Sequence, residues 1–327
     1  MITLEDDGLV IRFPEVHEDA VLRIEFQRTL RLPDDGKRYP LPPGLGCFPL
    51  RHLDDYAERL PEAWRRRGGA IMPMYQSEAL WIDFNTNGFF WRDSYPFAVK
   101  VAAGKINAVT GEPWREGLHG KPQDYLAVPQ QPWLDGFHVA KGTIRQFVAM
   151  PLGEGFTAEE QLTETAEWGG IQLLVYPLRA ELWRHEKLCM MGLYKCKVMG
   201  LAPGGRMRQE IYADHRPVEH YDQTSAARCF VTIVNSTQWQ AVTGEAPPHR
   251  PPTAAEYSEA GLPWFDWYDA DAEALAGSPV LAGLTSVAAK TAEKGLLPDP
   301  ADTTPVRPRR VHKLRSRRRP VREADIL

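Results

Sequence analysis

The chain has 327 residues, a mass of 37.0 kDa and a formal net charge of −4 at pH 7. Its 43% hydrophobic and 25% charged residues are typical of a globular protein, and its four cysteines are too few for a disulfide scaffold. A chain of this length buries about 70% of its unfolded surface or more, so we expect it to need neither disulfides nor metals to hold a core.

The stretch MITLEDDGLVIRF, residues 1–13, is acidic and lacks the basic start and long apolar run of a signal peptide. The sequence contains no run of about 18 apolar residues, and its most apolar run, IQLLVYPL, has the length of a strand. We therefore expect a cytoplasmic protein without a membrane span.

Residues 21–32 (VLRIEFQRTLRL) place apolar side chains at alternate positions over much of their length, which predicts a half-buried strand. A loop rich in proline and glycine follows. Residues 53–69 then have helical character, with a break or a new start at Pro61 and an end at Gly68 and Gly69.

Residues 71–84 and 96–111 predict strands, and the second stretch is expected to fold into a hairpin at its Ala-Gly-Lys sequence. Residues 142–178 indicate a strand, a loop, a short helix and another strand. The helix start is marked by Thr157 and by Glu160 three positions later, which together form a capping box.

The last third of the chain adds one strand and two helices. Residues 228–234 (RCFVTIV) predict the strand. Thr253 and Glu256 form a second capping box, and residues 269–277 (DADAEALAG) predict a further short helix.

Together these elements predict an α+β fold dominated by strands. We expect one compact β-rich body, residues 1–295, with a few short helices, followed by a disordered tail, residues 296–327. The tail is rich in proline and arginine, and residues 307–322 contain nine Lys and Arg and no acidic residue. Burial in such a segment cannot offset the entropy of ordering it.

The pentapeptide AVTGE occurs twice, at residues 108–112 and 241–245. At the same offset, residues 74–114 align with residues 207–247, and a β-type stretch precedes each copy. Two interpretations are open: an internal duplication that gives two pseudo-equivalent β-rich lobes, or a coincidence. In both, the glycine permits the positive φ of a turn.

Four longer stretches suggest a relationship: RTLRLPDDGKRYPLPPGLGCFPL, MPMYQSEALWIDF, IRQFVAMPLGEGFTAEEQLT and RCFVTIVNSTQWQAVTGEAPP. In them the chain resembles an uncharacterised family of bacterial proteins, over most of residues 20–270 and without the tail. Some members of that family carry the label of integral membrane proteins, which the lack of a spanning stretch in this chain does not support. The resemblance implies no activity and carries over no catalytic residue.

The densest polar cluster is DHRPVEHYD, residues 214–222. Imidazole and carboxylate groups are ligands for zinc, manganese and iron. His215, Glu219 and His220 could converge in a loop on a divalent metal, which would give a metal-assisted hydrolase. The alternative is a solvated surface loop, and outside the hydrolase hypothesis we predict no cofactor.

The loop GLAPGGRMRQ, residues 200–209, is the favoured anion-binding candidate. Gly204, Gly205, Arg206 and Arg208 combine a flexible backbone with positive charge, and the loop has no acid. A second glycine loop, PLGEGFT, opens a helix, but the glutamates around it repel phosphate. The alternative for both loops is an ordinary turn.

The basic tail offers five arginines for nonspecific contact with nucleic acid or another anionic surface. They are Arg309, Arg310, Arg317, Arg318 and Arg319. The alternatives are contact with the acidic body or a merely solubilising terminus. Aromatic residues cluster at 87–97 and 263–268, which favours core or a partner interface over a ligand platform.

The sequence contains no recognisable catalytic motif. Our leading hypothesis is a non-catalytic cytoplasmic binding or assembly protein, with a protein partner or self-association. The two alternatives are the metal-assisted hydrolase and a nonspecific nucleic-acid-associated protein.

Overall fold

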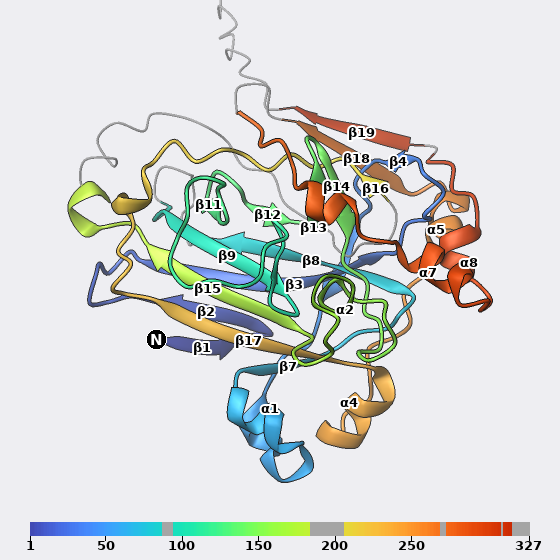
Figure 1. Cartoon of the computed structure of the whole chain (residues 1–327), viewed down its shortest axis with the longest axis horizontal. Coiled ribbons are helices and arrows are strands. Elements are labelled where there is room, and N and C mark those ends of the chain that lie inside the picture. Colours follow the sequence, from blue (N-terminus) through green and yellow to red (C-terminus); the bar gives the residue numbers. More distant parts are fainter. Residues whose placement is uncertain (87–93, 184–205, 269–272, 309, 316–327) are drawn as a thin grey trace, which may run out of the picture.

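The computed structural model describes residues 1–86, 94–183, 206–268, 273–308 and 310–315. Strands dominate it, forming several sheets beside a few short helices, so the predicted α+β, β-dominated fold is confirmed (Figure 1). Within these ranges, no helix is long and apolar enough to cross a bilayer.

The first large sheet has six strands, in the order β1-β2-β3-β8-β12 with β5 paired to β3. Their bounds are β1 (Ile2–Glu5), β2 (Gly8–Arg12), β3 (Val21–Leu30), β5 (Gly44–Cys47), β8 (Glu78–Asn85) and β12 (Trp133–Leu134). Strand β3 alternates between half-buried and buried side chains only in its first half, and its second half is buried on both faces. Arg28 in that half therefore needs a partner, and its Nε donates to Glu78 Oε2 at 2.7 Å.

The second large sheet has seven strands, in the order β10-β9-β15-β17-β7-β6 with β11 paired to β9. Their bounds are β6 (Arg51–His52), β7 (Ala70–Pro73), β9 (Phe97–Ala103), β10 (Ile106–Asn107), β11 (Leu126–Val128), β15 (Ile171–Pro177) and β17 (Ala227–Val234). The hairpin predicted at Ala-Gly-Lys is confirmed, since Gly104 and Lys105 both have positive φ between β9 and β10.

The two large sheets share one hydrophobic core. Buried residues from both belong to a single cluster of contacting apolar side chains. The rings of Phe13, which follows β2, and Phe97, in β9, lie 6.1 Å apart between centroids. Figure 1 shows the strands of the two sheets overlapping in the body of the molecule, with α1 and α4 gathered at one edge beside β7.

Two smaller sheets complete the strand content. Strands β13 (Gly136–Ala140), β14 (Thr143–Gln146), β16 (Arg206–Met207) and β4 (Arg38–Tyr39) form one, and β18 (Pro263–Tyr268) and β19 (Arg310–Arg315) form the other. In the four-stranded sheet, Ile144, Met207 and Tyr39 stand opposite one another and are all buried. These three side chains mark its inner face.

The helices are short, and only some of them begin where the sequence predicted; α4, for example, lies in the β-type stretch expected before the second AVTGE copy. They are η1 (Leu53–Arg59), α1 (Glu62–Arg67), α2 (Ala158–Thr163), η3 (Val218–His220), α4 (Ser236–Thr243), α5 (Ala254–Glu259), α6 (Pro279–Ala282), α7 (Val287–Glu293) and α8 (Pro300–Thr303). The capping boxes at Thr157 and Thr253 are both formed, and Pro61 separates η1 from α1 as predicted. The helix predicted at 269–277 is not found in the part that is described, where Ala274 makes a β-bridge with Tyr212.

The packed body extends beyond residue 295, the boundary that we predicted from composition. Helix α8 carries Asp302, whose carboxylate receives Arg31 Nε at 2.9 Å and Nη2 at 2.6 Å. Both side chains are 1% exposed. A buried ion pair, which the composition of the segment does not reveal, thus attaches α8 to the end of β3. Beyond α8, β19 pairs with β18, and residues 309 and 316–327 of the predicted tail lie outside the described ranges.

The two AVTGE copies share a local turn. In each, the glycine N–H donates at 2.9 Å to the carbonyl four residues back, and the threonine Oγ1 accepts from the glutamate amide two residues on. Gly111 and Gly244 have positive φ, 75° and 78°, as the sequence predicted. The first copy is a separate turn after β10, whereas the second ends helix α4.

The structure does not support the duplication of residues 74–114 and 207–247. Strands β9 and β17 lie in the same sheet on either side of β15, and not in two lobes. Phe97 stands opposite Pro177 of β15, whereas Phe230 stands opposite Gln172. A hairpin follows β9 and a helix follows β17. The repeated residues therefore encode the same turn within unrelated surroundings.

Candidate functional site

A cavity of about 440 Å³ lies at one end of the seven-stranded sheet, where β9 and β17 end and β15 begins. Its other walls come from α1, α2, the start of α4 and residues 147–157. The lining is mainly apolar, and its larger side chains include Met74, Leu80, Phe137, Phe147, Phe156 and Ile171. This size and lining are typical of sites that bind small molecules.

One wall of the cavity is held by Glu159, in the first turn of α2. This side chain is buried, and its carboxylate accepts hydrogen bonds from the amides of Glu167, Trp168 and Gly169 at 2.8, 2.8 and 2.7 Å. A buried carboxylate is stabilised by such amide donors. Glu159 therefore fixes the loop of residues 164–170 against α2.

The next residue, Glu160, fixes the opposite loop. Its carboxylate accepts from the amides of Gly153, Gly155 and Thr157 at 2.8, 2.7 and 3.1 Å. Burial raises the pKa of Glu160, but the hydrogen bonds from Thr157, Gly155 and Gly153 outweigh it and lower the pKa below its ordinary value. The PLGEGFT loop thus directs its amides to a glutamate of the same chain. This agrees with the expectation that the glutamates around this loop repel phosphate.

A cation and an aromatic ring close a further side of the cavity. Arg67, at the end of α1, donates to the carbonyls of Trp168 and Glu167 at 2.8 and 2.6 Å. Its guanidinium also lies 4.9 Å from the centre of the Trp168 ring. This stacking adds a cation–π attraction and joins α1 to the loop that Glu159 holds.

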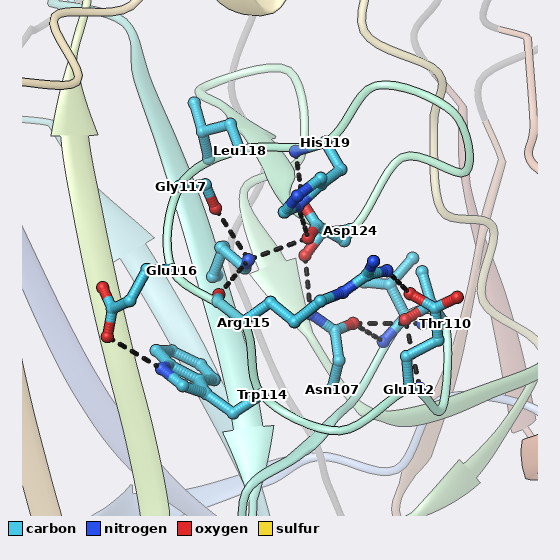
Figure 2. A network of polar contacts seen from close by, with 12 residues as sticks. Asn107, Thr110, Glu112, Trp114, Arg115, Glu116, Gly117, Leu118, His119 and Asp124 are labelled. Carbon is cyan, nitrogen blue, oxygen red and sulfur yellow. Dashed lines mark hydrogen bonds and ion pairs between the residues drawn. The ribbon is translucent and has the colours of Figure 1, made fainter.

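A separate polar network surrounds Lys100, in the middle of β9 (Figure 2). The side chain is 1% exposed, and Nζ donates to the carbonyls of Arg115 and Gly117 at 2.7 Å each. Nζ also lies 2.8 Å from Asp124 Oδ2. These three acceptors match the three donors of an ammonium group. Lys100 therefore attaches the loop of residues 111–125 to the sheet, and Figure 2 shows Arg115, Gly117 and Asp124 of that loop within one polar network.

His119 shares the same carboxylate. Its Nδ1 lies 2.8 Å from Asp124 Oδ2, and its side chain is 38% exposed. If the neutral imidazole donates from Nδ1, then Nε2 is its proton acceptor, which is the arrangement of a general base. Among the described residues, no serine, threonine or cysteine hydrogen-bonds to His119. His119 and Asp124 therefore have the arrangement of a general base, but no described nucleophile lies within hydrogen-bond reach of the imidazole.

The predicted metal ligands of residues 214–222 are not brought together. His215 and Glu219 are exposed, and His220 is half-buried at the end of η3. In the described part of the chain, no group of three His, Cys, Asp or Glu is arranged to hold a metal ion. Asp214 turns inward, accepts from the hydroxyls of Tyr221 and Tyr125 at 2.7 and 3.1 Å, and lies 3.7 Å from the Arg216 guanidinium.

The predicted anion loop is divided by the structure. Gly204 and Gly205 lie outside the described residues. Arg208 lies 3.6 Å from Asp266 of β18 in an ion pair, so a carboxylate of the same chain partly neutralises it. Arg206 opens β16 and is exposed. Of the four predicted residues, Arg206 alone is described without an acidic partner.

Arg206 has two other arginines as strand neighbours. Arg145 of β14 stands opposite it on one side and Arg38 of β4 on the other. Sequence analysis missed both, because the three positions come from distant parts of the chain and no local pattern links them.

The arginines predicted to contact nucleic acid can be placed only in part. Arg310 opens β19, and its side chain is outside the description. The other four, Arg309, Arg317, Arg318 and Arg319, lie wholly outside it. Nucleic-acid contact through the tail stays a prediction.

Lys100 and the cavity were also missed by sequence analysis. A signal for Lys100 was present, because a single lysine interrupts the apolar run FAVKVAA. A charged residue within such a strand implies burial with a partner. The cavity has no comparable signal, since its walls come from segments far apart in the chain. The aromatic residues Tyr95, Phe97 and Trp264 belong to the core.

No family model matches this chain, and no curated protein and no solved structure matches it.

Proposed function

We propose that this chain is a non-catalytic binding protein that holds a small, largely apolar molecule in the cavity at the end of the seven-stranded sheet. The observation that carries the proposal is the bracing of the cavity walls. Glu159 and Glu160 each bind three backbone amides of the loops that border it. A site already held in shape loses less conformational entropy when a ligand binds.

The lining indicates the class of ligand. Phe137, Phe147 and Phe156 present aromatic surface, and Leu80 and Ile171 present aliphatic surface. Polar groups are confined to parts of the wall, such as Arg67 with Trp168. A molecule with an aromatic or branched apolar body and a few polar atoms suits this lining.

The test uses a neutral apolar fluorophore, N-phenyl-1-naphthylamine, titrated into the whole protein. We expect saturable binding of about one equivalent. Ala149 lines the cavity, so Ala149→Trp fills part of it and should weaken binding by at least about tenfold, or roughly 1.4 kcal/mol. Ala63 is exposed on α1, and Ala63→Trp is the matched control that should leave binding unchanged.

Two results would contradict the proposal. One is the absence of saturable binding by the wild-type protein. The other is equal binding by the Ala149→Trp variant, with its fold verified by circular dichroism, because the fluorophore would then occupy another surface.

Of the alternatives predicted from the sequence, one lacks support in the structure and the others stay predictions. Metal-assisted hydrolysis loses its basis, because His215 and Glu219 are exposed and make no metal site with His220. Nonspecific nucleic-acid association, self-association or a protein partner, and cytoplasmic location stay predictions from the sequence.

A further inference from the structure

We propose that Arg38, Arg145 and Arg206 form a binding site for a phosphate-like oxyanion on the outer face of the four-stranded sheet. This site is separate from the cavity and does not depend on the function proposed for it.

The strand register brings the three arginines together. Arg145 pairs with Arg206, and Arg206 pairs with Arg38, across three neighbouring strands. Residues directly opposite each other in paired strands have their side chains on the same face, with Cβ atoms about 5 Å apart. The buried row Ile144, Met207 and Tyr39 occupies the other face. The arginines therefore form a row on the outer face.

Such a row is unfavourable without a counter-charge, since like charges directly opposite each other destabilise a sheet. Arg145 is the critical member, because it is only 8% exposed. Its side chain has no hydrogen bond or ion pair with any described residue, and its Nη1 is buried without a partner. Buried polar groups are nearly always paired in folded proteins.

Other buried arginines of this chain show what is missing. Arg28 has the carboxylate of Glu78 at 2.7 Å, and Arg31 has that of Asp302 at 2.6 Å. Arg145 has no such carboxylate in contact with it among the residues that the structure describes. Burial lowers the pKa of Arg145, the charge of Asp34 raises it, and the charge of Arg206 lowers it. Asp34 makes no ion pair with Arg145 and does not replace such a carboxylate.

The chemistry of the row indicates its ligand. Guanidinium groups bind phosphate and carboxylate through two parallel N–H bonds, and three of them together favour an anion with two negative charges. Phosphate fits this description. It could be free phosphate or the phosphate group of an ester.

The experiment is calorimetric titration of the whole protein with inorganic phosphate, in chloride buffer at fixed ionic strength. We expect saturable binding, weakened at least about tenfold by Arg206→Gln, which alters an exposed side chain. Arg65→Gln, on the exposed side of α1, should leave binding unchanged. A second titration with phenyl phosphate separates the two sources, since binding at least about tenfold tighter than that of phosphate would identify an ester.

Thermal unfolding gives a second measurement. The difference in unfolding temperature between Arg206→Gln and the wild type should change sign between chloride and phosphate. In chloride, Arg206→Gln should unfold about 1–2 °C above the wild type, because it relieves like-charge repulsion. In saturating phosphate the order should reverse. The proposal fails if wild-type protein shows no saturable phosphate binding, or if Arg206→Gln and Arg65→Gln bind phosphate equally well.

Discussion

Lys100 and Arg145 are both cations buried in sheets, and the fold treats them in opposite ways. Lys100 is 1% exposed, and its ammonium has two carbonyl acceptors and the carboxylate of Asp124. Arg145 is 8% exposed, and its guanidinium has no acceptor among the described residues. A buried charge is tolerated when its partners are supplied. The first cation is therefore part of the framework, and the second is the one for which we propose an external anion.

His138 of β13 is a third case. It is 1% exposed, and neither ring nitrogen has a hydrogen-bond partner. Burial lowers its pKa to about 4, so the side chain is neutral at pH 7. Arginine cannot lose its proton in this way, which is why the lack of a partner has different consequences at Arg145.

The largest effect is expected when the paired cation is removed. Lys100→Met leaves Asp124 buried without its ammonium and should lower the free energy of unfolding by about 3–5 kcal/mol, measured by urea denaturation. The double variant Lys100→Met with Asp124→Leu should regain much of this loss, because no charge is then buried. Arg228→Met removes an exposed pair with Glu116 and should change stability by less than about 1 kcal/mol. A loss at Lys100→Met as small as this would show that the network does not hold the loop.

An intermediate effect is expected from His138 on lowering the pH. Its folded-state pKa of about 4 lies below the ordinary value of 6.5, so between these values the unfolded chain binds a proton that the folded chain does not. Stability attributable to His138 is therefore complete above pH 6.5 and falls as the pH approaches 4, by roughly 2–3 kcal/mol at pH 4.5.

The measurement compares urea denaturation at pH 7.5 and pH 4.5 for the wild type and for His138→Met. Between pH 7.5 and pH 4.5, the variant should lose roughly 2–3 kcal/mol less stability than the wild type loses. His215→Met, at an exposed loop position, is the control and should leave the difference unchanged. Equal pH dependence in the wild type and His138→Met would refute the role of the buried imidazole.

The smallest effect, with the opposite sign, is expected at Arg145. Arg145→Met removes a cation that has no partner, so in chloride buffer we expect stability equal to that of the wild type or higher by up to about 1 kcal/mol. Urea denaturation of this variant beside Lys100→Met makes the comparison directly, with the same substitution at both cations. A loss of several kcal/mol at Arg145→Met would mean that its guanidinium is satisfied within the fold.

Features formed by neighbouring residues could be predicted from the sequence. The capping box of Thr157 and Glu160 and the hairpin turn at Gly104 and Lys105 depend on residues a few positions apart, and both are present. The AVTGE turn belongs to the same class, since its hydrogen bonds recur in both copies. Its surroundings do not recur, because a pentapeptide determines a turn and not the strand pairing around it.

Features formed across the chain could not be predicted. The pairing of Arg145 with Arg206 and Arg38 requires the strand order of the four-stranded sheet. The metal site predicted at residues 214–222 fails for the opposite reason. Its spacing in sequence was dense, but His215 and Glu219 point to solvent while Asp214 binds tyrosine.

The ion pair between Arg31 and Asp302 joins residues 271 positions apart, and this separation has a consequence for synthesis. At about 5–20 residues per second, a ribosome makes Asp302 roughly 15–50 seconds after Arg31. During that interval β3 can pair with β8, but Arg31 cannot be enclosed without an uncompensated charge. The six-stranded sheet therefore reaches its final stability only after α8 has emerged from the ribosome.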